Sequence, residues 1–159
     1  MTTIRFEAFC QRVCDAMGVE LPGSLAQDPL PPAITLTFEG VEIGLIQASF
    51  TDDEHAILLV EFGPLPTGRE REACEVLLGA NFLMMGTQPP VFSMHPETGS
   101  VYFHHGFRLT DADPAQVQAQ AHEMVAAVQR WRSGEFVLAG GLGDEQAPSV
   151  LMAAVGTRA

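Results

Sequence analysis

The stretch ITLTFEGVEIGLIQ, residues 34–47, decides the fold because it predicts two strands joined by a tight turn at Gly40. In the first strand, residues 34–39, apolar side chains alternate with threonines, which is typical of a strand with one buried face. In the second strand, residues 41–50, both alternating sets of side chains are largely apolar. Such a strand is covered on both faces or keeps one face for a partner.

The elements on either side of this hairpin indicate one α+β domain. The run AILLVEF, residues 56–62, predicts a third strand and favours an antiparallel meander. Apolar spacing and turn residues predict helices over residues 2–18 and 69–85, strands over 91–94 and 100–107, and a helix that begins near Pro114. The order αβββαββα indicates an α+β fold built on an antiparallel sheet. We expect the domain to occupy residues 1–133 and residues 134–159 to form a flexible or weakly docked tail.

The helix over residues 69–85 has more large apolar side chains than one buried stripe can use. Phe82 and Met85 lie outside its predicted core stripe. That stripe consists of Ala73, Val76, Leu77, Ala80, Leu83 and Met84. We expect a self-interface and a binding surface, unless the loop over residues 20–33 and the tail cover the apolar surplus.

The charge of the chain is strongly acidic, with 8 arginines against 20 acidic residues and a net charge of −12. Such a field repels phosphate backbones and anionic lipid, so we expect no nucleic-acid partner. No lysine is present, which excludes Schiff-base chemistry and a P-loop lysine. The apolar runs are shorter than the ~18 residues of a membrane span, and the N-terminus lacks the apolar stretch of a signal peptide. We therefore expect no membrane insertion and a cytoplasmic location.

The sequence contains no recognisable catalytic or metal-binding set of residues. His104 and His105 are adjacent, so on a strand they point to opposite faces and cannot bind one ion together. Cys10 and Cys14 lie four residues apart on one predicted helix, where they bridge poorly, and Cys74 stands alone. The three cysteines are expected to be reduced thiols. We expect no enzymatic activity, no metal and no cofactor.

Two segments carry a resemblance to a known family. They are ACEVLLGANF, residues 73–82, and VFSMHPETGSVYF, residues 91–103. With the first helix, the element order, the size and the acidity, they resemble the "LLxxNF" and "tG.v.l" core of the type III secretion chaperones in the Tir chaperone (CesT-like) family. The resemblance covers roughly residues 2–133. The chain departs from the family at His95, where Asp is common, and in its longer tail.

This resemblance implies a homodimeric chaperone that holds the N-terminal chaperone-binding segment of a type III secreted effector. The bound segment stays extended, soluble and secretion-competent, and no ATP is consumed. By analogy, the helix over residues 69–85 and the strand over 91–94 would form the dimer interface, with candidates Val76, Leu77, Ala80 and Val91. The first helix and the sheet would supply the effector patches, with candidates Phe6, Phe9, Leu36, Phe38, Leu45 and Ile46.

Other interpretations stay open at this point. Each candidate contact could instead be ordinary core. A charge at Leu45 or Ile46 distinguishes the two cases, because it should abolish effector binding in a folded dimer if the residue belongs to a patch and unfold the chain if it is core. The alternative function is an acidic regulatory binding module, such as an anti-activator that sequesters a protein partner. An enzyme that uses His104 or His105 is a further rival, which no residue spacing favours.

Overall fold

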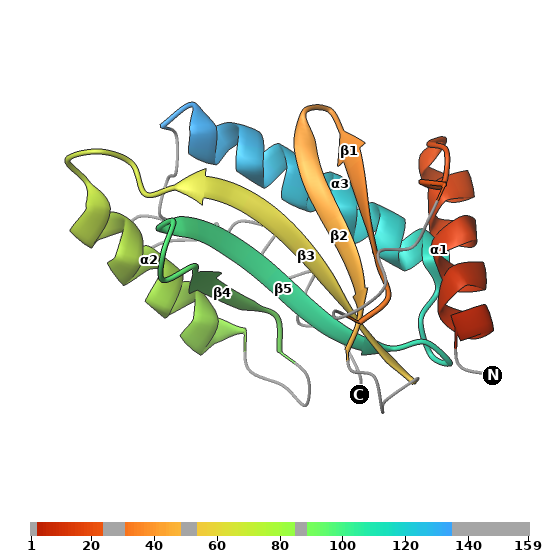
Figure 1. Ribbon diagram of the computed structural model, residues 1–159. Helices are drawn as coiled ribbons and strands as arrows, with labels where there is room; N and C mark the ends of the chain where they lie inside the picture. Colours follow the sequence, from red (N-terminus) through yellow and green to blue (C-terminus); the bar gives the residue numbers. More distant parts are fainter. Residues whose placement is uncertain (1–2, 24–30, 49–53, 85–88, 135–159) are drawn as a thin grey trace.

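The computed structural model describes residues 3–23, 31–48, 54–84 and 89–134 (Figure 1). Within them lie α1 (Thr3–Met17), β1 (Ala33–Phe38), β2 (Val41–Gln47), β3 (His55–Pro64), α2 (Glu70–Leu83), β4 (Val91–Met94), β5 (Ser100–Arg108) and α3 (Pro114–Arg132). This confirms the predicted α+β fold and the order αβββαββα. The tail predicted beyond residue 134 lies outside the described residues, so its assignment stays a prediction.

The described strands form one antiparallel sheet in the order β1-β2-β3-β5-β4. β1 and β2 are joined by Glu39 and Gly40, whose φ angles of 49° and 76° are those of a type I′ hairpin turn. The predicted meander of the first three strands is confirmed. β5 then pairs with β3 and places β4 at one edge of the sheet, while β1 lies at the other edge.

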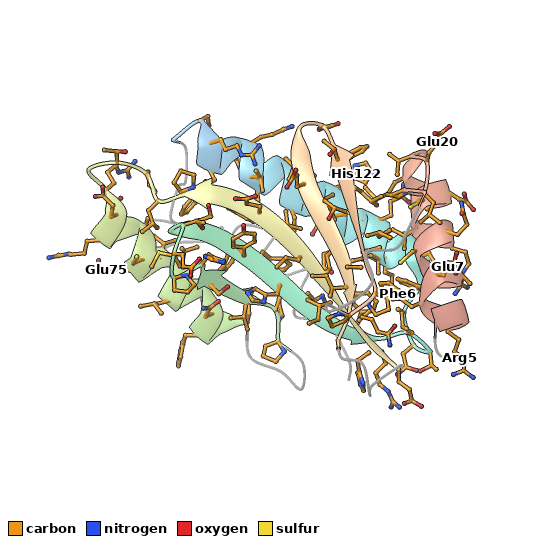
Figure 2. The ribbon with its side chains drawn as sticks, viewed as in Figure 1. Arg5, Phe6, Glu7, Glu20, Glu75 and His122 are labelled. Atoms are coloured by element: carbon orange, nitrogen blue, oxygen red, sulfur yellow. The ribbon has the colours of Figure 1, made fainter. Side chains whose placement is uncertain are left out.

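One face of the sheet packs against α1 and α3 and contains the core. Figure 1 shows α3 running behind the sheet and α1 at the end nearest β1. Phe6 is fully buried between α1 and the sheet, whereas Arg5 and Glu7 of the same helix point away from the sheet (Figure 2). The largest fully buried side chains come from both helices and three strands, β2, β3 and β5: Phe6, Phe9, Val13, Val41, Ile43, Leu45, Leu58, Val60, Val101, Phe103, Val125 and Val128.

Polar contacts fix α3 across the sheet. Asp113 caps its first turn by accepting a hydrogen bond from the Ala115 amide at 3.0 Å, and Pro114 follows the cap. At the other end, the Trp131 indole N–H donates to the Pro64 carbonyl at 3.1 Å, and Arg132 donates to the Gly40 carbonyl at 2.9 Å. These contacts hold α3 against both the hairpin turn and the end of β3.

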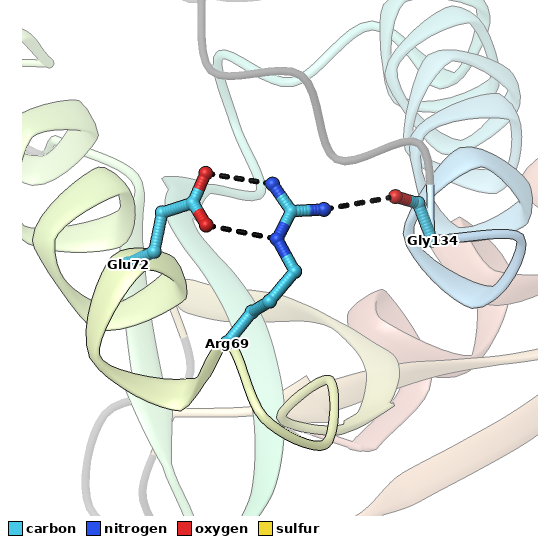
Figure 3. Close-up of polar contacts among 3 residues, drawn as sticks. All are labelled: Arg69, Glu72 and Gly134. Carbon is cyan, nitrogen blue, oxygen red and sulfur yellow. Dashed lines mark hydrogen bonds and ion pairs between the residues drawn. The ribbon is translucent and has the colours of Figure 1, made fainter.

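The start of α2 is tied to the end of α3. The Arg69 guanidinium donates to both carboxylate oxygens of Glu72, at 2.8 and 2.6 Å, and to the Gly134 carbonyl at 3.5 Å (Figure 3). The hydrogen bonds from Arg69 lower the pKa of the Glu72 carboxyl. All these groups are at the surface, so the contact orients α2 more than it stabilises the fold.

Candidate partner-binding surfaces

Five large apolar side chains of α2 and β4 are exposed, and we call them the α2–β4 patch. They are Leu78 (68% exposed), Phe82 (70%), Leu83 (62%), Val91 (39%) and Met94 (52%). Leu78 and Phe82 lie four residues apart and therefore share one face of α2. These five are all the large apolar side chains that are exposed among the described residues, and they lie on two adjoining elements.

The sequence predicted that Leu83 lies in the buried stripe of α2. This prediction was wrong, because the Leu83 side chain is 62% exposed. The buried side of this helix runs through Ala73, Ala80 and Met84. Successive residues in a helix are separated by about 100°, which turns Leu83 away from this side. The prediction that Phe82 lies outside the stripe is confirmed.

The four predicted dimer contacts occupy different depths. Val91 belongs to the α2–β4 patch, and Val76 and Leu77 are half-buried against the core at its border. Ala80 is buried beneath the helix. Sequence reasoning missed Leu78 and Met94 as exposed groups, although the four-residue spacing of Leu78 and Phe82 was a usable signal.

The exposed face of α2 changes from charged to apolar along its length. Arg71 and Glu75 form an ion pair at 3.1 Å in the first and second turns of the helix, and Glu75 points into solvent in Figure 2. Leu78 and Phe82 continue the same face toward the C-terminal end of the helix. A partner on this face would therefore meet a polar half and an apolar half.

The Asn81 side chain joins α2 to β4. Its Oδ1 accepts a hydrogen bond from the Phe92 amide at 2.7 Å, and its Nδ2 donates to the Phe92 carbonyl at 2.9 Å. Both groups are partly buried between the helix and the strand. Sequence reasoning noted Asn81 only as part of the LLGANF motif and missed this role.

The second apolar surface is the sheet face turned away from α1 and α3. Ile46 on β2 pairs with Ile57 on β3, and Gly44 pairs with Leu59. Paired residues in an antiparallel sheet point to the same face, so these side chains lie together. Ile46, Ile57 and Leu59 are half-buried, and we call them the outer-face strip.

The six predicted effector contacts divide between the core and the surface. Phe38 and Ile46 are half-buried, and the Phe38 ring meets the His122 ring edge-on at 4.6 Å. The other four lie in the core of the single chain: Phe6, Phe9, Leu36 and Leu45. Solvent therefore reaches only two of the six candidates, and whether any of them contacts an effector stays a prediction.

The backbone of β1 presents polar groups to the side away from β2. The Gln47 amide donates to the Pro32 carbonyl at 2.8 Å, which makes residues 32, 34, 36 and 38 the ones that bond to β2. The amide and carbonyl groups of Ala33, Thr35 and Thr37 therefore point outward from the described sheet. An extended peptide could pair with them.

The two adjacent histidines lie on opposite faces of β5, as predicted. His104 contacts the Ser93 hydroxyl through Nε2, and the His105 Nδ1 lies 2.8 Å from Oε1 of Gln120 on α3. Burial lowers the pKa of His104, and no charged neighbour contributes to this shift. Within the described residues His104 forms no ion pair with a carboxylate, so Ser93 and His104 are not part of a Ser–His–carboxylate triad there.

The cysteines are free thiols, as expected. Burial raises the pKa of Cys10 to about 12 and also raises the pKa of Cys14, so both are neutral, unreactive thiols. The described residues contain no group of three His, Cys, Asp or Glu side chains that could hold a metal ion. Among the helices in this part of the chain, none has the length and hydropathy that a membrane span requires.

Solved structures share this fold. A chain of the HopA1–SchA chaperone–effector complex is similar with a TM-score of 0.59 and 11% identity, over 82% of this chain and 94% of that one. A chain of the ExsC–ExsE complex gives a TM-score of 0.57 and 14% identity, over 82% and 92% of the two chains. A chain of the ExoT–SpcS complex from Pseudomonas aeruginosa gives 0.52 and 16%, over 79% and 96%. At these identities the likeness establishes the fold.

Sequence comparison identifies the family. No curated protein of similar sequence is found. The model of the Tir chaperone protein (CesT) family matches residues 31–132, from two residues before β1 to the end of α3. This match agrees with the motif in α2 and the hairpin of β4 and β5. The chain belongs to the Tir chaperone protein (CesT) family.

Proposed function

We propose that this protein is a cytoplasmic type III secretion chaperone. It binds the N-terminal segment of a secreted effector and keeps it soluble and secretion-competent without ATP. The observation that carries the proposal is that one small acidic domain has two separate apolar surfaces, the α2–β4 patch and the outer-face strip beside β1. Family membership and the chaperone–effector complex among the similar structures support it.

The α2–β4 patch is the proposed homodimer interface. Leu78 and Phe82 of one copy would pack against the same residues of a second copy around a two-fold axis, as an isologous interface requires. Fully burying such a side chain contributes about 1.5–3 kcal/mol. Val91 would take part directly, Val76 and Leu77 at the border, and Ala80 from beneath.

The effector segment would bind along the β1 edge. The outward amide and carbonyl groups of Thr35 and Thr37 would pair with an added strand. Alternate apolar side chains of that strand would lie on the two faces of the sheet, toward Phe38 on the face that α3 covers and toward Ile46 on the outer face. Phe6, Phe9, Leu36 and Leu45 would support this surface from the core. Ordering the segment costs about 2–5 kcal/mol or more, which apolar burial must offset.

Binding of this kind needs no ATP, because hydrophobic contacts and backbone hydrogen bonds hold the segment at equilibrium. The net charge of −12 favours segments that carry basic residues and keeps the unloaded chaperone soluble.

The decisive experiment is to tag the protein in its native bacterium, block secretion, and identify co-purifying proteins by mass spectrometry. We expect one dominant partner, bound through its N-terminal segment and released when it is secreted. A DNA-binding regulator as the partner would instead support the anti-activator alternative, and a stoichiometric metal or metabolite would support an enzyme.

Two neighbouring residues test the surface assignment. Ile46→Glu should abolish capture of the effector while circular dichroism and the urea midpoint stay close to wild type, because Ile46 lies on the outer face. Leu45→Glu should unfold the chain, because Leu45 is fully buried and an unpaired buried charge is costly. A folded Ile46→Glu variant that still binds the effector would remove the outer-face strip from the binding surface.

A further inference from the structure

The two edge strands of the described sheet, β1 and β4, differ in whether a side chain bonds to their outward backbone groups. A sheet edge exposes backbone N–H and C=O groups that can pair with any extended chain. β1 and β4 are the edges here. A chaperone that handles unfolded segments would meet such chains routinely, so each edge must either accept a strand or be closed to it.

On β4, the backbone amide and carbonyl groups that point away from β5 belong to alternate residues. The His95 amide donates to the Ser100 carbonyl at 2.8 Å, so residues 91, 93 and 95 face β5. The backbone amide and carbonyl groups of Phe92 and Met94 therefore point away from β5, and those of Phe92 meet Asn81 of α2. Pro90, two residues before Phe92, has no N–H to offer. The Phe92 backbone is thus the central pairing site on this four-residue edge.

Asn81 occupies that pairing site. Its carboxamide accepts from the Phe92 amide at 2.7 Å and donates to the Phe92 carbonyl at 2.9 Å. A carboxamide carries the same donor and acceptor as a peptide unit, so Asn81 takes the place of one residue of a neighbouring strand. Ala80 and Met84, both buried, hold this turn of α2 in place.

We infer that Asn81 closes the β4 edge to added strands and so restricts strand addition by an unfolded partner segment to β1. Thr35 and Thr37 on β1 have backbone groups that face outward, and the described residues supply no side chain that caps them as Asn81 caps Phe92. The inference rests on the proposed function, because it specifies where the partner segment binds. Asn81 acts here as a specificity-determining residue.

The test uses the full chain and a peptide probe whose binding site is located by NMR. The probe alternates valine and threonine, has arginines at its ends and carries a nitroxide label. With wild type, it should broaden amide signals of Thr35 and Thr37 and leave those of Phe92 and Met94 unchanged. With Asn81→Ala, broadening should also occur at Phe92 and Met94, and hydrogen exchange of the Phe92 amide should rise roughly tenfold.

Two further variants separate edge closure from a general loss of stability. Asn81→Asp keeps the acceptor for the Phe92 amide but loses the donor to its carbonyl, so it should give partial opening of the edge. Gln118→Ala removes an amide that donates to the Ala16 carbonyl at 2.6 Å, far from β4 in the sequence and on other elements. This control should leave the β4 signals unchanged when the probe is added.

The NMR results that would overturn the inference about Asn81 differ from the result that would refute the proposed function. If the probe binds β4 of wild type, or if Asn81→Ala exposes the Phe92 amide without gaining probe binding at β4, Asn81 does not close the edge. If wild type does not bind the probe at β1, the restriction to β1 fails. Failure to capture any secreted effector in the bacterium would instead refute the chaperone proposal and leave the edge measurement unaffected.

Discussion

α2 and α3 are both amphipathic helices, but within the described residues only α3 has its apolar side covered. α3 buries six side chains against the sheet, including Val128 and Trp131, whereas α2 buries Ala73 and Ala80 and leaves Leu78 and Phe82 largely exposed. α3 lies across the sheet face, and α2 lies beside the edge strand β4 (Figure 1). A helix at a sheet edge has room for only a narrow buried stripe, so its remaining apolar surface is available to a partner.

The largest effect should come from placing a charge on the covered helix. Val128→Asp should unfold the chain, because Val128 is fully buried and an unpaired buried carboxylate costs about 3–5 kcal/mol of a typical stability of about 5–15 kcal/mol. Phe82→Asp on the uncovered helix should leave the circular dichroism spectrum unchanged. Urea unfolding measures both. A native urea midpoint for Val128→Asp would show that α3 is not covered as described.

The second effect concerns self-association through the α2–β4 patch. Leu78→Glu should convert a dimer to a monomer and weaken association by at least about 2 kcal/mol, because it places a charge at the centre of the proposed interface. Sedimentation equilibrium measures the change. Ala119→Glu, on the exposed side of α3, adds the same charge and should leave association unchanged. Equal association of both variants with wild type would place the interface elsewhere.

Exchanging glycine and alanine in the two helices should change the free energy of unfolding by smaller amounts and in opposite directions. Gly79 lies in α2, and a Cβ added there meets no atom within 4 Å. Gly79→Ala should therefore raise the free energy of unfolding by about 0.5–1 kcal/mol, measured in the Leu78→Glu background so that dimer contacts do not contribute. Ala126→Gly, on the exposed side of α3, should lower it by a similar amount. If Gly79→Ala destabilises the monomer, that part of α2 is more closely covered than the structure indicates.

The smallest effect is a pH dependence at His104 on β5, which lies beside Ser93 and Val91 of β4. Burial lowers the pKa of His104 below its usual value of 6.5, so the unfolded chain binds a proton first as the pH falls. Stability should decrease as the pH falls through about 6.5 and level off below the pKa of the folded state. In His104→Gln, the urea midpoint should vary less with pH between about 7 and 5. Identical slopes would show that His104 is not linked to folding.

Local patterns were sufficient for the elements and for the core of the covered regions. The patterns of residues 34–39 and 41–50 predicted the first hairpin, whose strands run over Ala33–Phe38 and Val41–Gln47, and Gly40 predicted its turn. In α3, the buried residues Val117, Ala121, Met124, Val128 and Trp131 recur at steps of three and four residues, which is the period of a helix with one buried side. These patterns are reliable because an element that packs on a broad apolar surface repeats its buried positions regularly, about every 3.6 residues in a helix and every two residues in a strand.

The same patterns failed where a residue has no broad surface opposite it. Leu78 and Leu83 have the same side chain as the fully buried Leu45 and Leu58. Only the position of α2 beside the edge strand β4 leaves Leu78 and Leu83 exposed. Asn81 gave no signal of its pairing with Phe92, because the two residues are separated by eleven positions and meet only in the folded chain.

The sequence by itself determined the order of helices and strands, the acidic surface and the family, since each depends on local periodicity, composition or motif. The tertiary structure alone decided which apolar residues are core. Leu45 and Ile46 are adjacent and equally apolar, but Leu45 lies on the sheet face that α1 and α3 cover, and Ile46 lies on the other face. The physical reason is that burial depends on what packs opposite a side chain, which hydrophobicity alone does not specify.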